Sequence, residues 1–147
     1  VLEPGCGMGY FTLPLARMVG PAGRVIVVDI EPRMLAVLAR RAHKAGLSER
    51  IVIRPAEPEK LGISDLSGAI DVALLIHTVH EMPNAGALFA EILQALKPGG
   101  QVLVIEPKGH VSAAEFSKTA AKAEKTGLRA DAAFTDIKRR RLLLNKT

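Results

Sequence analysis

The chain has 147 residues and a formal net charge of +5 at neutral pH, with 48% hydrophobic, 24% charged and only 3% aromatic residues. These values are ordinary for a globular domain, and so few aromatic side chains disfavour a surface that stacks single-stranded nucleic acid. The single cysteine, Cys6, excludes an internal disulfide and a cysteine-cluster metal site. No apolar run is long enough to cross a membrane. We expect residues 1–147 to form one domain that binds no metal and works in the cytoplasm.

Basic residues are concentrated in the last part of the chain. Residues 108–147 contain ten Lys or Arg and four Asp or Glu, a net charge of +6, so the preceding residues sum to −1. The basic run at 138–141 lies between two expected strands, where the simpler interpretation is a solvated turn. The alternative is a patch that attracts nucleic acid, anionic lipid or an acidic substrate.

Apolar segments alternate with amphipathic segments along the chain, which predicts successive β-α-β units around a parallel sheet. Residues 1–3 resemble the end of a strand, and 10–19 a helix that follows a glycine-rich loop. The next expected elements are a strand at 24–30, a helix at 31–45, a strand at 51–54, a turn at 65–68, a strand at 70–76, a helix at 84–96, a turn at 97–100, a strand at 101–106 and a helix at 113–126. Segments 128–134 and 141–145 are too close in sequence to hold a crossover helix, so we expect an antiparallel closing pair of strands.

Three glycines alternate at Gly5, Gly7 and Gly9, between the first expected strand and the first expected helix. Glycine lets the backbone turn sharply there and lets a ligand approach without meeting a Cβ atom. Asp29 follows twenty residues after Gly9, at the end of the second strand, where a carboxylate can accept hydrogen bonds from two ribose hydroxyls. This spacing fits either a dinucleotide or S-adenosylmethionine.

Two neighbours of the glycine loop separate these ligands. A dinucleotide site favours a further glycine where the helix packs beneath the pyrophosphate, but that residue is Tyr10. Glu3 places a carboxylate just before the loop, which would repel a pyrophosphate and attract the ammonium and sulfonium groups of S-adenosylmethionine. Cys6 has no neighbouring base in the loop, so we do not expect a nucleophilic role for it.

Four segments resemble, in order, motifs of the class I S-adenosylmethionine-dependent methyltransferases. They are VLEPGCGMG at 1–9, VVDIEPRML at 27–35, AIDV through HEMP at 69–83, and LKPGGQVLVIE at 96–106. The chain is most similar to the small-molecule branch that includes ubiquinone/menaquinone-biosynthesis and arsenite methyltransferases. The resemblance implies a Rossmann-like α/β fold with a doubly wound, mostly parallel sheet, an antiparallel last strand and strand order 3-2-1-4-5-7-6.

The resemblance also implies a role for each residue on the ribose and methionine side of the cofactor. Glu3 would contact the methionine ammonium, directly or through water. Gly5, Gly7 and Gly9 would lie against the methionine and ribose portions. Asp29 would bind the ribose diol.

On the adenine side, the resemblance implies that Ile30 packs on the ring and that Ala56 presents its backbone amide to the ring edge. Ile76 would line the methionine part. Family members often carry an acid just before the Ala56 position, aimed at the adenine amino group, but this chain has Pro55 there. Either Glu57 makes that contact instead or the contact is lost.

Candidate residues that would meet the methyl acceptor follow the expected strands at 70–76 and 101–106, at the edge where ligands meet an α/β sheet. A base is needed only if the acceptor loses a proton. His80 is our candidate catalytic base, because an imidazole can take up a proton near neutral pH; the alternative is a capping or surface histidine. His77 and Glu81 lie beside it in the sequence, and His110, after the fifth expected strand, is a further candidate for the acceptor side; we assign no metal to these residues. Asp71 is expected to be structural.

We therefore expect an enzyme that transfers a methyl group from S-adenosylmethionine to a small-molecule acceptor, with S-adenosylhomocysteine as product. The alternatives are an RNA or protein methyltransferase that uses the basic run, a nicotinamide-dependent dehydrogenase, and a non-catalytic nucleotide-binding module. Residues 76–79, Ile-His-Thr-Val, lack the Asn-Pro-Pro-aromatic signature of many nucleic-acid amino-methylating enzymes. Relatives carry one or two helices before the first strand that help to cover the acceptor, and we expect this chain to lack them.

Overall fold

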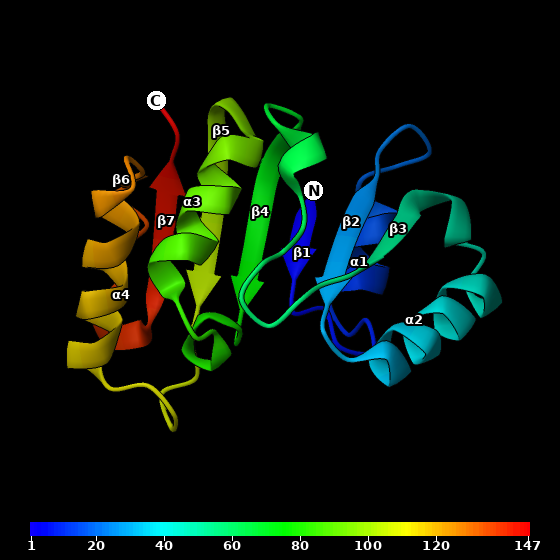
Figure 1. Ribbon diagram of the computed structural model, residues 1–147, viewed down its shortest axis with the longest axis horizontal. Coiled ribbons are helices and arrows are strands. Elements are labelled where there is room, and N and C mark those ends of the chain that lie inside the picture. Colours follow the sequence, from blue (N-terminus) through cyan, green and yellow to red (C-terminus); the bar gives the residue numbers. More distant parts are fainter.

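The computed structural model describes residues 1–147, which form one seven-stranded sheet with helices on both of its faces (Figure 1). The strands are β1 (Leu2–Pro4), β2 (Val25–Asp29), β3 (Ile51–Pro55), β4 (Ile70–Ile76), β5 (Leu96–Ile105), β6 (Arg129–Ala130) and β7 (Arg141–Asn145). The helices are α1 (Thr12–Met18), α2 (Pro32–Lys44), α3 (Ala85–Ala95) and α4 (Ala113–Lys125), with short 3-10 turns η1 (Ser48–Arg50), η2 (Ser64–Leu66), η3 (Val79–Glu81) and η4 (Ile137–Arg139). None of these helices has the length and hydropathy that a membrane span requires.

The strand order is β3-β2-β1-β4-β5-β7-β6. The first five strands of the chain pair in parallel, whereas β7 runs antiparallel to β5 and β6 runs antiparallel to β7. The predicted α/β fold, its strand order and its antiparallel end are therefore confirmed.

Two predicted boundaries differ from the structure. The strand expected at 128–134 is only two residues long, because the chain turns after the Asp131 amide donates to the carbonyl of Leu143, and Thr135 N then donates to Asp131 O. The turn expected at 97–100 lies inside β5 as an irregularity of the β4–β5 register. Gly99 has φ +75° at that point, which is the positive-φ glycine that the Pro-Gly pair predicts.

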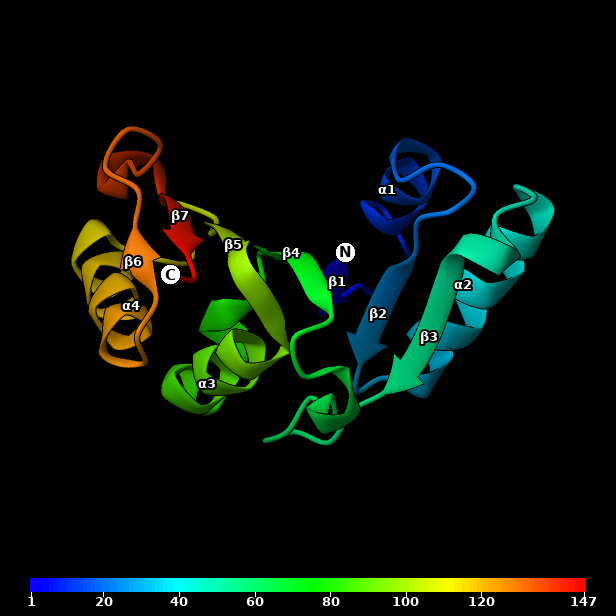
Figure 2. The ribbon, with the colours of Figure 1, turned by 90° about the horizontal axis from the view of Figure 1, so that it is seen from above.

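The helices lie on opposite faces of the sheet according to the direction in which the chain crosses it. The steps from β1 to β3 move toward one edge and the step from β4 to β5 toward the other, so right-handed crossovers place their helices on opposite faces. Figure 2 shows α1 on the other side of the sheet from α3 and α4. Two buried clusters of 22 and 10 residues form the core. Phe89 and Phe116 are the only buried aromatic residues, so the core is largely aliphatic.

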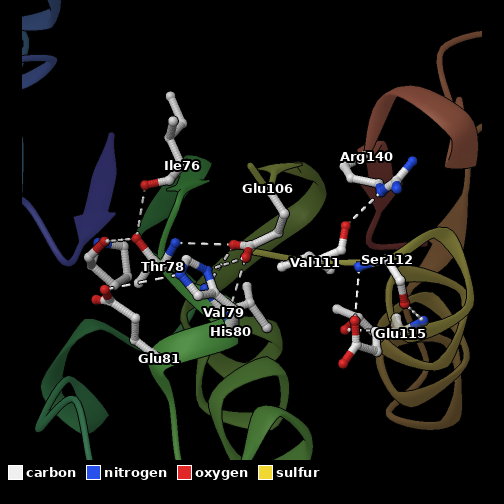
Figure 3. Close-up of polar contacts among 12 residues, drawn as sticks. Ile76, Thr78, Val79, His80, Glu81, Glu106, Val111, Ser112, Glu115 and Arg140 are labelled. Carbon is white, nitrogen blue, oxygen red and sulfur yellow. Dashed lines mark hydrogen bonds and ion pairs between the residues drawn. The ribbon is translucent and has the colours of Figure 1, made fainter. Parts of the chain in front are cut away.

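Local side chains fix where the loops at the carboxyl edge enter α2 and α4. The Glu31 side chain accepts a hydrogen bond from the Arg33 amide, and Pro32 occupies the first helical position. Ser112 and Glu115 form a reciprocal capping box at the start of α4 (Figure 3). Both helices therefore begin at the carboxyl edge of the sheet. The strand order reverses between β1 and β4, and ligands of α/β sheets bind in the crevice at such a reversal.

Candidate cofactor and acceptor site

The loop after β1 depends on glycine at three positions for different reasons. Gly5, Gly7 and Gly9 have φ values of +71°, +53° and +90°, in the region that favours glycine. A Cβ atom on Gly5 would lie 2.7 Å from the Thr78 side chain, and one on Gly9 would lie 2.3 Å from a δ-carbon of Leu38. A Cβ atom on Gly7 would meet nothing within 4 Å. Gly5 and Gly9 thus permit close packing, while Gly7 leaves space for a ligand.

Asp29 ends β2 with its carboxylate held against the glycine loop. The amide of Gly7 donates to Oδ2 at 2.9 Å, and the amide of Glu31 donates to Oδ1 at 2.9 Å. Glu31, not Asp29, is the N-cap of α2, so the Asp29 carboxylate does not cap that helix. A carboxylate has further lone pairs, so an oriented Asp29 can still accept hydrogen bonds from a diol.

A cavity of about 430 Å³ lies at this carboxyl edge. It brings together five of the predicted cofactor residues, since its lining includes Gly5, Gly7, Asp29, Ile30 and Ala56. The segment after β3 and the start of α3 close the opposite wall. A cavity of this size is in the range of small-molecule sites.

Ionisable groups on the wall of the cavity are mostly acidic. Its apolar residues are Val28, Ile30, Met34, Ala56, Leu61, Met82 and Leu88. Its acidic residues are Asp29, Glu31, Glu57, Glu59, Glu81 and Glu91, and Lys60 is the only basic residue. Such a wall suits a cationic ligand with an apolar ring better than a pyrophosphate, because like charges at close range repel.

Glu3 is buried beneath the glycine loop, 5% exposed, and does not line the cavity. Thr12 Oγ1 donates to its carboxylate at 2.5 Å. Burial raises the pKa of Glu3 to about 7, although the hydrogen bond from Thr12 opposes this rise. A nearby cation would favour the ionised form of such a carboxyl. The same burial, with the charges of Asp29 and Glu3, raises the pKa of Cys6 to about 12, so Cys6 remains a neutral thiol.

Two further predicted contacts are placed differently by the structure. Ala56 lines the cavity, but its amide donates to the carbonyl of Asp29 at 3.0 Å and is not free to meet an adenine edge. Glu57 lines the cavity beside it. Ile76 does not line the cavity; its carbonyl accepts a hydrogen bond from Thr78 Oγ1 at 3.0 Å.

A second polar cluster lies where β4 and β5 end, around Glu106 (Figure 3). The Glu106 side chain is 1% exposed. Its carboxylate accepts hydrogen bonds from the amides of Thr78 at 3.0 Å, Val79 at 2.9 Å and His80 at 3.3 Å. It also contacts Nδ1 of His80. Glu106 was not among the residues predicted for the site, although it is an acid directly after a buried strand, and a similar position at a strand end identified Asp29.

His80 lies within this cluster and not on the cavity wall, while its neighbours Thr78 and Glu81 do line the cavity. The His80 side chain is 21% exposed, and its Nε2 lies 3.9 Å from Glu81 Oε1. The ring of His110 stands nearly perpendicular to the His80 ring, with centroids 5.8 Å apart. His77 has φ +55° and is exposed. No three or more His, Cys, Asp or Glu side chains are grouped so that they could hold a metal ion.

Outside these clusters, two charged features are structural. Asp71 forms an exposed ion pair with Lys97 at 2.6 Å, at the amino end of β4. In the basic run, Arg140 Nε donates to the Val111 carbonyl at 2.8 Å (Figure 3), and Arg139 pairs with Asp136 at 3.5 Å. Half of the run thus stabilises its own turn, which favours the turn interpretation over a nucleic-acid patch.

The chain matches the family model described as "Methyltransferase domain" over residues 1–100. With the strand order and the glycine-loop site described above, this match shows that the chain belongs to the class I S-adenosylmethionine-dependent methyltransferases.

Two curated relatives show which proteins the chain is similar to. It is 31% identical over 105 residues to the demethylmenaquinone methyltransferase of Lactobacillus johnsonii, covering 71% of this chain and 42% of that protein. It is also 31% identical over 106 residues to the ubiquinone/menaquinone biosynthesis C-methyltransferase UbiE of Stutzerimonas stutzeri, covering 72% of this chain and 41% of that protein. The chain thus spans less than half the length of these relatives.

Solved structures confirm the fold. A SAM-dependent methyltransferase from Aquifex aeolicus superposes with a TM-score of 0.81 at 19% identity, over 98% of this chain and 79% of that one. The [4+2]-cyclase SpnF superposes with a TM-score of 0.77 at 23% identity, over 92% of this chain and 53% of that one. Since one of these proteins is a cyclase, the fold alone does not establish methyl transfer, and the function must be argued from the site.

Proposed function

We propose that this chain binds S-adenosylmethionine in the 430 Å³ cavity and transfers its methyl group to a small-molecule acceptor, in the cytoplasm. The observation that carries the proposal is the pairing of Gly7 and Asp29. Their direct hydrogen bond places a carboxylate acceptor beside a loop that has room for a ligand. When bound, S-adenosylmethionine supplies an electrophilic methyl group, so the protein mainly positions the acceptor and excludes water.

Five of the cavity residues hold the cofactor in this proposal. Asp29 accepts the ribose hydroxyls, and Gly5 and Gly7 let the backbone approach the methionine and ribose portions. Ile30 packs on the adenine ring, and the carboxylate of Glu57 is available for the adenine amino group that Pro55 cannot serve.

Three further predicted residues act from outside the cavity lining. Glu3 balances the cationic methionine end through the field of its buried carboxylate, directly or through water. Gly9 lets α1 and α2 pack closely behind the loop. Ile76 ends the strand behind the methionine portion.

On the acceptor side, His80 takes a proton from an acceptor that must lose one during transfer. A small-molecule acceptor is supported by the relatives, whose names specify quinone-biosynthesis substrates. The acidic cavity wall and the internal contacts of Arg140 give little support to an RNA substrate.

Thermal-shift measurements with S-adenosylmethionine, S-adenosylhomocysteine and NAD test the proposal. A ligand that binds the folded state raises the melting temperature by mass action. We expect both sulfur ligands to raise it and NAD to leave it unchanged. A rise with NAD alone would refute the cofactor assignment. Release of S-adenosylhomocysteine in a screen of small phenols and quinols then tests transfer itself, and binding without release from any acceptor class would favour a non-methylating role.

A further inference from the structure

Glu106 and His80 form a pair that the cofactor site does not use. Glu106 directly follows β5 and its side chain is almost fully buried, yet its carboxylate is surrounded by donors from a single turn, η3 and its N-cap. Three successive amides of that turn, Thr78, Val79 and His80, donate to it, and the His80 imidazole turns back to present Nδ1 to it (Figure 3). Capping the turn needs only the amides, so the imidazole contact is additional.

This arrangement determines which nitrogen of His80 carries the hydrogen. A carboxylate only accepts hydrogen bonds, so the ring nitrogen that faces Glu106 must be the donor. In a neutral imidazole with Nδ1–H, the free lone pair is on Nε2. We propose that Glu106 is a positioning residue that holds His80 in this tautomer and leaves Nε2 as the proton acceptor at the ends of β4 and β5.

The surroundings of His80 place Nε2 on the functional edge of the sheet. Thr78 and Glu81, on either side of His80 in the sequence, both line the cofactor cavity. The charged or titratable groups that face the ring are Glu106 from β5, Glu81 from the same turn and His110 from the loop after β5. Arg140 holds the next residue of that loop, Val111, through its carbonyl. The imidazole thus has fixed neighbours on both strands.

The acceptor class follows from this chemistry, and this step rests on the proposed function. The acceptor carries a hydroxyl or an activated C–H, of the phenol or enol type, whose proton leaves during transfer. That proton moves to Nε2 of His80, and the acceptor's electron pair forms the bond to the methyl carbon. The bond from that carbon to sulfur breaks with its pair kept on sulfur. The Glu106 carboxylate beside Nδ1 stabilises the imidazolium that forms.

The proposal is tested by measuring the tautomer of His80 in the absence of any methyl acceptor. Protein labelled with ¹⁵N-histidine gives long-range ¹H–¹⁵N correlations that distinguish Nδ1–H from Nε2–H, and the His80 signals are assigned by their loss in His80→Gln. At a pH above which these shifts no longer change, we expect Nδ1–H in the wild type. An Nε2–H form would overturn the proposal, and this measurement needs no variant of Glu106 to fold.

Glu106→Gln extends the test. With its oxygen in the place of Oε1, the glutamine still accepts hydrogen bonds from the Thr78 and Val79 amides, and its amide group, in the place of Oε2, donates to Nδ1, so the tautomer should invert. Glu115→Gln makes the same change in the cap of α4, away from His80, and should leave the tautomer as it is. An unchanged tautomer in folded Glu106→Gln would refute the positioning role.

Cofactor affinity separates this proposal from the proposed function. Glu106→Gln should bind S-adenosylhomocysteine within about twofold of the wild type, since it does not line the cavity. If the wild type fails to bind S-adenosylhomocysteine, the proposed function fails while the tautomer result stands. With an acceptor from the phenol and quinol screen, Glu106→Gln should lower kcat by about 10²- to 10⁴-fold with little change in that affinity. An unchanged kcat would refute the catalytic consequence.

Discussion

Replacement of Asp29 by alanine probes the residue on which the cofactor site depends most. The carboxylate sits on the cavity wall and is oriented by two main-chain amides, each at 2.9 Å. Alanine removes the proposed acceptor for the ribose hydroxyls and also releases the amides of Gly7 and Glu31. Hydrogen bonds to a charged group contribute about 1.5–3 kcal/mol to binding. We therefore expect Asp29→Ala to weaken S-adenosylhomocysteine by about 2 kcal/mol, which is roughly 30-fold in Kd.

Isothermal titration calorimetry with S-adenosylhomocysteine at 25 °C measures this change. Asp71→Ala is the matched control, because it removes a carboxylate whose only partner is Lys97 on the exposed amino end of β4. An exposed ion pair contributes at most about 1 kcal/mol to stability. The Asp71–Lys97 pair lies at the amino end of β4, away from the cavity at the carboxyl edge. The control should therefore keep wild-type affinity. Asp29→Asn keeps one acceptor oxygen and should fall between the wild type and Asp29→Ala.

Two outcomes would contradict the reasoning. If folded Asp29→Ala bound S-adenosylhomocysteine within twofold of the wild type, Asp29 would not be a ribose ligand. If Asp71→Ala lost as much affinity as Asp29→Ala, the effect would come from general loss of charge or stability and not from the site.

Three further changes test other parts of the structure. In Gly7→Ala the added Cβ meets open space, so the variant should lose only about 1–2 kcal/mol of stability to backbone strain and should bind the ligand more weakly. In Gly9→Ala the added Cβ would clash at 2.3 Å, so the free energy of unfolding measured in urea titrations should fall by about 2–4 kcal/mol. Equal stability losses would contradict the packing role of Gly9. Because burial raises the pKa of Glu3 from 4.5 to about 7, the folded state binds its proton more tightly than the unfolded state, so stability should fall by up to roughly 3 kcal/mol between pH 4.5 and 7. Glu3→Gln should remove that part of the slope, and an identical slope in the variant would exclude Glu3 as its cause. Arg140→Ala should destabilise the protein by about 1–2 kcal/mol and Arg139→Ala by less than about 0.5 kcal/mol in thermal unfolding; the reverse order would show that the Val111 contact is unimportant.

Much of the fold and the glycine-loop half of the site could be predicted from the sequence. β4 spans residues 70–76 as its continuous apolar run predicts, and α2 begins and ends where Glu31, Pro32 and Gly46 place its caps. These features depend on backbone chemistry within a few residues of one another. Gly7 and Asp29 are 22 residues apart in the sequence. Gly7 lies in the loop after β1 and Asp29 ends β2, and these strands belong to one β-α-β unit, so their hydrogen bond is also a consequence of local order.

The acceptor half of the site could not be predicted in the same way. The sequence suggested His80 as a base, but it did not indicate that the His80 imidazole contacts Glu106, 26 residues later. The Ala56 amide is another example, because the extension of β2–β3 pairing to Asp29 uses the donor that the ligand was expected to meet.

The class of fold, the order of its elements and the place of the glycine loop follow from the sequence, because glycine conformation, hydrophobic periodicity and strand ends act over short range. Which groups face the cavity and which are buried behind it depends on the packing of the whole chain. That packing brings Glu106 to His80 and buries Glu3 against Thr12, since burial and hydrogen-bond partners depend on which strands lie side by side.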